Sequence, residues 1–238
     1  MASAEAPSTV PHFKKSVARE YLESIVVAVI LALFIRTFVV QAFKIPTGSM
    51  ETNLLIGDHL LVNKVAYSPS GLPLEGQLLP KKPIQRGHVV VFKFPEDPTR
   101  DFIKRVIGLP GERVEIRNKV VSINGTPLDE PYVRFLEPPI HAQDAEIHGR
   151  PDGRDNWGPQ TVPAGHLFVL GDNRDNSRDS RFWGFLPVDQ VKGRALIVYW
   201  SYEASREEYH RTGYVDWIRD TLAAFGKTRW NRFFHMIR

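Results

Sequence analysis

Hydrophobic positions gather first in one long run near the start of the chain. Residues 25–35 read IVVAVILALFI, and Arg36 separates this run from a second apolar stretch. A bilayer core needs about 20 residues of helix. Residues 21–38 nearly supply that length, with Glu23 and Arg36 close to the two rims, where a long side chain can extend into the interface. The pattern therefore predicts a single transmembrane helix over residues 21–38.

A cleaved signal peptide and a buried core helix are the alternative interpretations of this run. No small-residue cleavage site such as Ala-X-Ala follows it, which disfavours a signal peptide. Lys14, Lys15 and Arg19 precede the run, and cationic residues stay on the cytoplasmic side of a membrane. We therefore expect a retained anchor, a cytoplasmic segment over residues 1–20 and export of the rest of the chain.

After Phe43 the pattern changes to short runs of β-branched and aromatic residues bounded by Gly and Pro, which is typical of strands. The 18 prolines and 17 glycines, mostly after residue 45, also favour strands and turns over helices. Strands are predicted over 59–63, 89–92, 102–107, 166–170 and 197–200, with a hairpin over 113–123 that turns near 117–119.

These predictions divide the rest of the chain into four stretches. Residues 39–127 and 166–205 form the two parts of a β core, and residues 128–165, rich in Pro, Gly and Asp, form a loop-rich insertion. In residues 206–238, Trp and Phe are interspersed with Lys and Arg, as in segments that lie in a membrane interface. The alternative for this tail is a helix packed on its own domain.

Composition and charge narrow the function classes. The chain is 42% hydrophobic and 24% charged, which is ordinary for a globular protein. Its formal charge of +4 is spread along the sequence without a concentrated basic stripe or a DNA-binding motif, so we expect no nucleic-acid partner. Attraction to anionic lipid is the better explanation of the positive charge. The absence of cysteine excludes disulfides, Cys-ligated zinc and thiol nucleophiles.

A candidate nucleophile lies about a dozen residues beyond the predicted helix. In FKIPTGSM (43–50), Pro46 fixes its own φ and Gly48 permits a sharp turn, which presents the hydroxyl and backbone N–H of Ser49. Taken alone, Thr-Gly-Ser is also an ordinary surface turn. A serine hydroxyl becomes a strong nucleophile only when a neighbouring base takes its proton.

The candidate base is a lysine. None of the eight histidines stands in a recognisable triad context, and Thr52 occupies the place of the lysine in an S-x-x-K motif. If residues 102–107 form a strand, Lys104 shares an apolar face with Phe102, and Arg105 lies on the opposite face between apolar neighbours of its own. Arginine is effectively never deprotonated in proteins, so of these two only Lys104 can act as a base. A solvated or salt-bridged lysine is the alternative.

A third candidate segment, GDNRDNSRDSR (171–181), is unusually dense in charged residues. A solvated turn and a calcium loop are its alternative interpretations. The calcium pattern fails because Phe182 stands at the twelfth position, where a Glu is needed. We interpret the segment as a hydrogen-bonded scaffold that orients neighbouring groups.

Together these segments resemble the bacterial type I signal peptidases, Ser/Lys-dyad endopeptidases that remove signal peptides from exported preproteins. The resemblance covers most of residues 21–200 and shows in four segments that follow the family's order and spacing: RTFVVQAFKIPTGSM (36–50), RGHVVVFKFP (86–95), DFIKRVIGLPGE (101–112) and GDNRDNSRDSRFWGFLP (171–187). It implies a mostly β, two-lobed antiparallel catalytic region after the helix, with the loop-rich insertion in the second lobe. It also implies a bacterial cytoplasmic-membrane location with the catalytic region outside, and no metal or cofactor.

The resemblance also implies a role for each matching residue. Ser49 is the nucleophile and Lys104 the general base, and the Thr47 hydroxyl and the Ser49 N–H form the oxyanion hole. Ser177 orients the lysine amine, and Asp179 and Arg181 form a structural ion pair. Shallow substrate pockets that select small side chains are expected to be lined by Phe43, Ile45, Met50, Leu54, Phe102 and Ile103.

The chain departs from the family pattern at a few positions. Thr47 replaces the commonest serine, Thr52-Asn53 replaces Pro-Thr, and His88 stands where Asp is typical. These changes bear on local loop geometry rather than on the dyad. Two rival classes are a soluble self-cleaving Ser/Lys regulator, which the anchor disfavours, and an inactive membrane-tethered module that binds exported peptides, which would need none of Ser49, Lys104 and Ser177.

Overall fold

The computed structural model describes residues 16–65, 67, 83–137, 154–203 and 226–237. By its contacts the chain separates into two units, residues 1–37 and 38–238. Each is described by itself.

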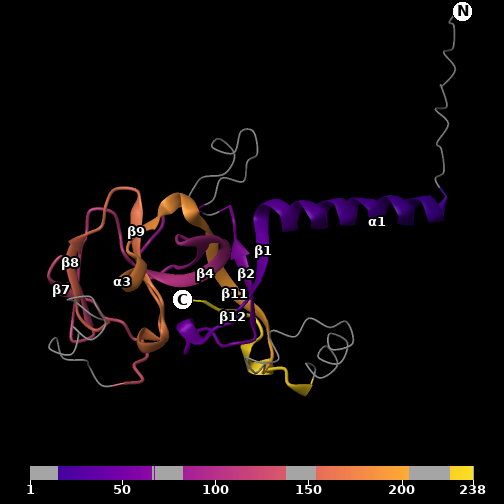
Figure 1. The fold of residues 1–238 in the computed structure, drawn as a ribbon. Helices are drawn as coiled ribbons and strands as arrows, with labels where there is room; N and C mark the ends of the chain where they lie inside the picture. Colours follow the sequence, from indigo (N-terminus) through magenta and orange to yellow (C-terminus); the bar gives the residue numbers. More distant parts are fainter. Residues whose placement is uncertain (1–15, 66, 68–82, 138–153, 204–225, 238) are drawn as a thin grey trace, which may run out of the picture. The chain divides into compact units, whose positions relative to one another are not determined.

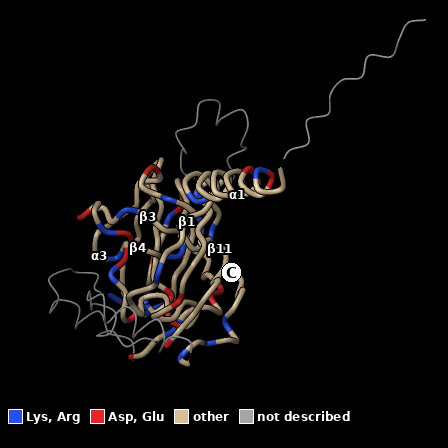
Figure 2. The backbone as a smooth tube through the Cα atoms, turned by 90° about the vertical axis from the view of Figure 1, so that its right-hand side faces the viewer, with Lys and Arg blue, Asp and Glu red and all other residues tan. Residues whose placement is uncertain are grey.

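The first unit contains helix α1 (Val17–Phe34), which continues into a π-helical turn at Ile35–Val39. The Ser16 hydroxyl accepts the backbone N–H of Arg19 and so caps the N-terminus. None of the α1 residues is buried, and Figure 2 shows the helix without charged residues beyond its N-terminal end. Of the helices in the described ranges, only the one over Val17–Val39 is long and apolar enough to cross a membrane. It begins four residues before the predicted start because Ser16, rather than the first apolar residue, caps it.

The second unit is built on two antiparallel sheets (Figure 1). The larger has the strand order β1-β2-β11-β3-β4-β9-β10, with β12 paired to β11. Its strands are β1 (Val40–Lys44), β2 (Asp58–Asn63), β3 (Val89–Phe94), β4 (Asp97–Gly108), β9 (His166–Leu170), β10 (Leu186–Pro187), β11 (Val191–Ser201) and β12 (His235–Met236).

The smaller sheet has the order β7-β6-β5-β8. It consists of β5 (Arg113–Arg117), β6 (Val120–Ile123), β7 (Thr126–Pro127) and β8 (Trp157–Thr161). The predicted hairpin over 113–123 is β5–β6, and its turn passes through Asn118 and Lys119 with φ of 47° and 70°. Strand β8 lies inside the stretch that we expected to be loop-rich, of which residues 138–153 are outside the described ranges.

The helical elements among the described residues of the second unit are short. They are α3 (Ser180–Trp183) and 3₁₀ turns at Gly48–Met50, Arg174–Asn176, Val188–Gln190 and Trp230–Arg232. The predicted fold class, mostly β and antiparallel after one apolar helix, is confirmed.

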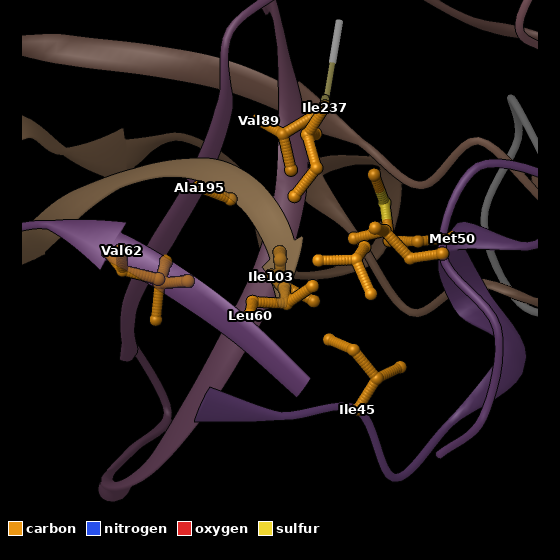
Figure 3. Close-up of a cluster of buried hydrophobic side chains, with 11 residues drawn as sticks. Ile45, Met50, Leu60, Val62, Val89, Ile103, Ala195 and Ile237 are labelled. Carbon is orange, nitrogen blue, oxygen red and sulfur yellow. The ribbon is translucent and has the colours of Figure 1, made fainter. Parts of the chain in front are cut away.

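One hydrophobic cluster of the described residues includes side chains of the segment that holds Ser49 (Figure 3). Ile45 and Met50 from that segment pack with Leu60 of β2 and Ile103 of β4. The alternation of buried and half-buried residues along β2 places Leu60 on this core face. The segment is therefore anchored by apolar contacts on both sides of Ser49.

The end of the tail packs on the larger sheet. Ile237 belongs to the same buried cluster, and β12 pairs with β11. The Arg232 guanidinium donates to both Asp58 carboxylate oxygens at 3.1 and 2.6 Å. Residues 226–237 therefore pack on their own domain, but as a 3₁₀ turn and a short strand instead of the helix of the alternative interpretation. The rest of the tail, residues 204–225, lies outside the described ranges.

Candidate active site

Ser49 lies in the loop that joins β1 to β2. The loop is closed at its base, where the Ile45 N–H donates to the Asp58 carbonyl at 2.9 Å and the Gly57 N–H donates to the Ile45 carbonyl at 3.1 Å. Between these bonds, Gly48–Met50 form a single 3₁₀ turn that buries Ser49. The turn orients the Ser49 hydroxyl toward β4.

Lys104 lies on β4, and its side chain contacts Ser49. Its Nζ lies 2.7 Å from the Ser49 Oγ and donates to the Ile103 carbonyl at 2.9 Å. The side chain is only 3% exposed. Strand pairing fixes its position, because Lys104 is opposite Val90 of β3. The two residues chosen from sequence as nucleophile and base, 55 positions apart, are thus in hydrogen-bonding contact.

Burial lowers the pKa of Lys104 from 10.5 to about 8. The negative charges of Asp179 and Asp172 oppose this shift, and the positive charge of Arg181 adds to it. Desolvation therefore has the largest effect, as expected for an amine removed from water. A substantial fraction of this lysine is neutral near pH 8, which a general base requires.

Two buried ion pairs lie behind the lysine. The Arg105 guanidinium donates to both oxygens of Asp172 at 2.8 and 2.7 Å, and both side chains are 1% exposed. Asp179 pairs with Arg181 at 2.8 and 2.9 Å. Burial raises the pKa of Asp179, but Arg181, the Gly171 N–H and the Ser177 hydroxyl together lower it below its usual range. Asp179 and Arg181 therefore stand where the resemblance places a structural ion pair.

The 171–181 segment also contacts the Ser49 turn directly. The backbone N–H of Asn173 donates to the Ser49 carbonyl at 3.1 Å, and its side-chain amide donates to the Gly48 carbonyl at 3.1 Å. A Cβ on Gly171 would lie 2.2 Å from the Ser177 Oγ and 2.5 Å from the Ser49 carbonyl oxygen. Only glycine fits at this position, because two segments far apart in sequence meet there.

An open cleft of about 310 Å³ gives access to the Ser49–Lys104 pair. Thr47 lines it beside Ser49, and Phe102 and Ile103 line it from β4. Thr47 is exposed, so its hydroxyl is available to a bound substrate. No group of three or more His, Asp or Glu side chains in the described ranges is arranged to hold a metal ion.

The remaining predicted residues fall in two places. Ile45, Met50 and Leu54 are buried in the core beneath the Ser49 turn, and Phe43 packs against that core. These four can shape the cleft from behind, and their role as pocket residues stays a prediction. The buried Ser177 hydroxyl lies beside the Asp179 carboxylate and helps to lower its pKa, and its lysine-orienting role stays a prediction.

Sequence reasoning missed several supporting contacts. Asn173 and Gly171 were inside a segment that had been singled out for its charge, yet nothing local indicated their partners. Asn53, noted only as a departure from the family pattern, donates to Asp172 at 2.7 Å and so connects the Ser49 loop to the Arg105–Asp172 pair. No sequence periodicity indicates a contact between residues 119 positions apart.

Comparisons with known proteins show to which family the sequence is similar. The family model for signal peptidase, peptidase S26, matches residues 18–200. Signal peptidase I of Leptolyngbya laminosa is 40% identical over 188 residues, which cover 76% of this chain and 79% of the relative. Signal peptidase IB of Staphylococcus aureus (strain COL) is 33% identical over 195 residues, which cover 80% of this chain and 94% of the relative. A solved signal peptidase I from Enterococcus faecalis V583 is 33% identical and covers 48% of this chain and 97% of its own, with a TM-score of 0.35.

These matches define the chain as a serine peptidase. It belongs to the signal peptidase family, peptidase S26.

Proposed function

We propose that this chain removes N-terminal signal peptides from exported preproteins, cutting after small-X-small sequences such as Ala-X-Ala. The observation that best supports this is the 2.7 Å contact between the buried Lys104 Nζ and the Ser49 Oγ at an open cleft. A peptide-binding module without catalysis has no use for a desolvated lysine against a serine hydroxyl, since burying an amine is costly.

The proposed mechanism is acyl transfer in two steps. Neutral Lys104 accepts the Ser49 hydroxyl proton as Oγ attacks the scissile carbonyl carbon. The resulting oxyanion accepts hydrogen bonds from the Ser49 N–H and the Thr47 hydroxyl, donors already in place before charge develops. Lys104 then returns the proton to the leaving amine as the C–N bond breaks. Water, deprotonated by Lys104, attacks the acyl-enzyme, and the proton passes back to the Ser49 Oγ as the ester bond breaks.

A substrate can bind as an added strand along β4. Residues 97–104 of β4 pair with β3 on one side only, because β9 pairs with β4 on the other side from Arg105 onward. On that second side, residues 97–104 form an edge without a strand partner among the described residues. An extended peptide can satisfy these backbone groups. Phe102 and Ile103 lie along this edge and line the cleft. Selection of small side chains at the first and third positions before the cut is part of this proposal.

A membrane anchor suits such a substrate, because a signal peptide's apolar segment is itself in the bilayer. We propose that the Val17–Val39 helix spans the bacterial cytoplasmic membrane with the basic N-terminal segment inside and the catalytic unit outside. Lipid contact by the tail is a further part of this proposal. Trp230 and Phe234 support it, being 66% and 71% exposed next to basic residues.

The test is cleavage of a preprotein with an Ala-X-Ala site by the full chain in detergent. The parent should cut after the second Ala, and Ser49→Ala should not cut. Ser122→Ala, on β6 of the smaller sheet, is the matched control and should cut like the parent. Equal cutting by Ser49→Ala would assign the activity to another residue or protein. Failure of the folded parent to cut would favour the peptide-binding module.

A further inference from the structure

A second cavity, of about 330 Å³, lies apart from the cleft and shares no lining residue with it. This volume is at the lower end of the range for small-molecule sites. The cavity is lined from β2, from the segment before β3 and from β11. The described lining residues are Asn63, Tyr67, Pro83, Gln85, His88, Arg194 and Leu196, and no acidic side chain is among them.

The hydrogen bonds of His88 fix which of its ring nitrogens has a proton. The backbone N–H of Gln85, which can only donate, lies 3.2 Å from Nδ1. Nδ1 is therefore the acceptor, and the Tyr67 hydroxyl bonded to the same atom must also donate to it. The proton of the neutral ring is consequently on Nε2, which makes that atom a hydrogen-bond donor. Burial, reinforced by the positive charge of Arg194, lowers the pKa of His88 to about 4, so the ring is neutral at pH 7.

Arg194 adds a positive charge to this cavity. Its half-buried side chain hydrogen-bonds with the Tyr67 hydroxyl but makes no ion pair within the described part of the chain. His88 stands where Asp is typical of the family pattern, and a neutral imidazole provides no counter-charge. A charge partly removed from water is costly unless it is paired. The cavity therefore combines a guanidinium, an imidazole donor and no described anion.

We propose that this cavity binds a phosphate group, with Arg194 as its principal ligand and the His88 Nε2–H as a second donor. A guanidinium donates two parallel hydrogen bonds to a phosphate, and the remaining oxygens are free to accept from His88. The phosphate can belong to a soluble molecule or to a phospholipid headgroup. The chemistry is the same for both, and the site is independent of the peptidase reaction.

The test uses the full chain in a maltoside detergent and a phosphate-free buffer, with inorganic phosphate as the probe. Binding is followed by calorimetry and by the ¹⁵N signals of the His88 ring. The parent should bind phosphate saturably, and Arg194→Gln should bind at least about tenfold more weakly, the loss of one charge-assisted contact. His88→Asp places a carboxylate in the cavity and should abolish binding. Arg117→Gln, an exposed position on β5, is the control and should bind like the parent.

Arg194→Gln and His88→Asp test the same site independently, so the test still works if one of them does not fold. Thermal unfolding shows whether each variant is folded. A shifted His88 signal in phosphatidylglycerol nanodiscs without added phosphate would assign the site to a lipid headgroup. A signal that shifts only when inorganic phosphate is added would assign it to a soluble phosphate. The proposal would be overturned if the parent showed no saturable binding in either setting. It would also be overturned if Arg194→Gln and His88→Asp both bound phosphate as tightly as the parent.

Discussion

The pKa of Lys104 sets the pH at which this chain should cleave. Lys104 acts as a base only when neutral, and burial lowers its pKa from 10.5 to about 8 in spite of the opposing charges of Asp179 and Asp172. Because an amine loses its charge as pH rises through its pKa, activity should increase with pH up to about 8 and level off above it. A lysine without this burial would keep gaining activity up to about pH 10.4.

The size of the effect follows from the two pKa values. With a pKa of about 8, roughly one lysine in ten is neutral at pH 7, whereas with 10.5 only about three in ten thousand would be. Burial thus raises the active fraction about 300-fold at neutral pH. The assay is kcat/KM for an Ala-X-Ala peptide between about pH 6 and pH 10, which reports the pKa of the free enzyme. The logarithm of kcat/KM should rise with unit slope and bend near pH 8.

Two results would refute this reasoning. A bend near pH 10.4 would show that Lys104 is hydrated rather than desolvated, and a flat profile would remove it as the base. Lys104→Arg is the control, because arginine stays charged throughout this range. It should fold and show no cleavage at any pH, and retained cleavage would exclude Lys104 from the reaction.

Three further predictions concern stability and rate. Lys104→Met should raise the free energy of unfolding at pH 7 by about 3 kcal/mol, because the parent's native state releases a proton more easily than its unfolded state. This gain should shrink as pH rises from about 8 to about 10.5, because the parent itself becomes more stable over that range. Urea unfolding at several pH values measures the gain, and a gain that stays constant would contradict the prediction. Gly171→Ala adds a Cβ that would lie 2.2 Å from the Ser177 Oγ, so it should lower the free energy of unfolding by about 1–3 kcal/mol and abolish most cleavage. Gly226→Ala, with open space around the new Cβ, is the control and should change neither stability nor cleavage. Thr47→Val should reduce kcat by about 100-fold or more with little change in KM, Thr47→Ser should retain activity, and similar rates for both would exclude the Thr47 hydroxyl from the oxyanion hole.

The sequence predicted those elements whose apolar residues alternate or run continuously. β9 was placed at its observed ends, and β2 and β3 were found to within two residues. The start of β4 was missed by five residues, because Asp97 to Asp101 are mostly polar and form the exposed arm of a hairpin. β1 was missed because it directly continues the apolar run of the helix, and β8 because Gly158 and Pro159 disfavour a strand.

The site was predictable only where chemistry restricts the choice of residue. Lys104 was separable from Arg105 because only one of the two can lose its proton, and the structure places that lysine on Ser49. Asn173 and Asn53 could not be found in this way, since an amide has no distinctive chemistry and its partners are distant in sequence. Their contribution comes from tertiary contacts that no local pattern records.

The two ion pairs behind Lys104 explain how a buried lysine can have a low pKa next to two carboxylates. A lone buried carboxylate at that distance would stabilise the charged amine and raise its pKa. Asp172 and Asp179 are each paired with a guanidinium at 2.7–2.9 Å, and the positive charge of Arg181 opposes their attraction for Lys104, so desolvation has the largest effect. The paired arginines thus limit how far the two carboxylates raise the pKa of Lys104. Both carboxylates are thus hydrogen-bonded while the pKa of Lys104 stays low, as its proposed role as general base requires.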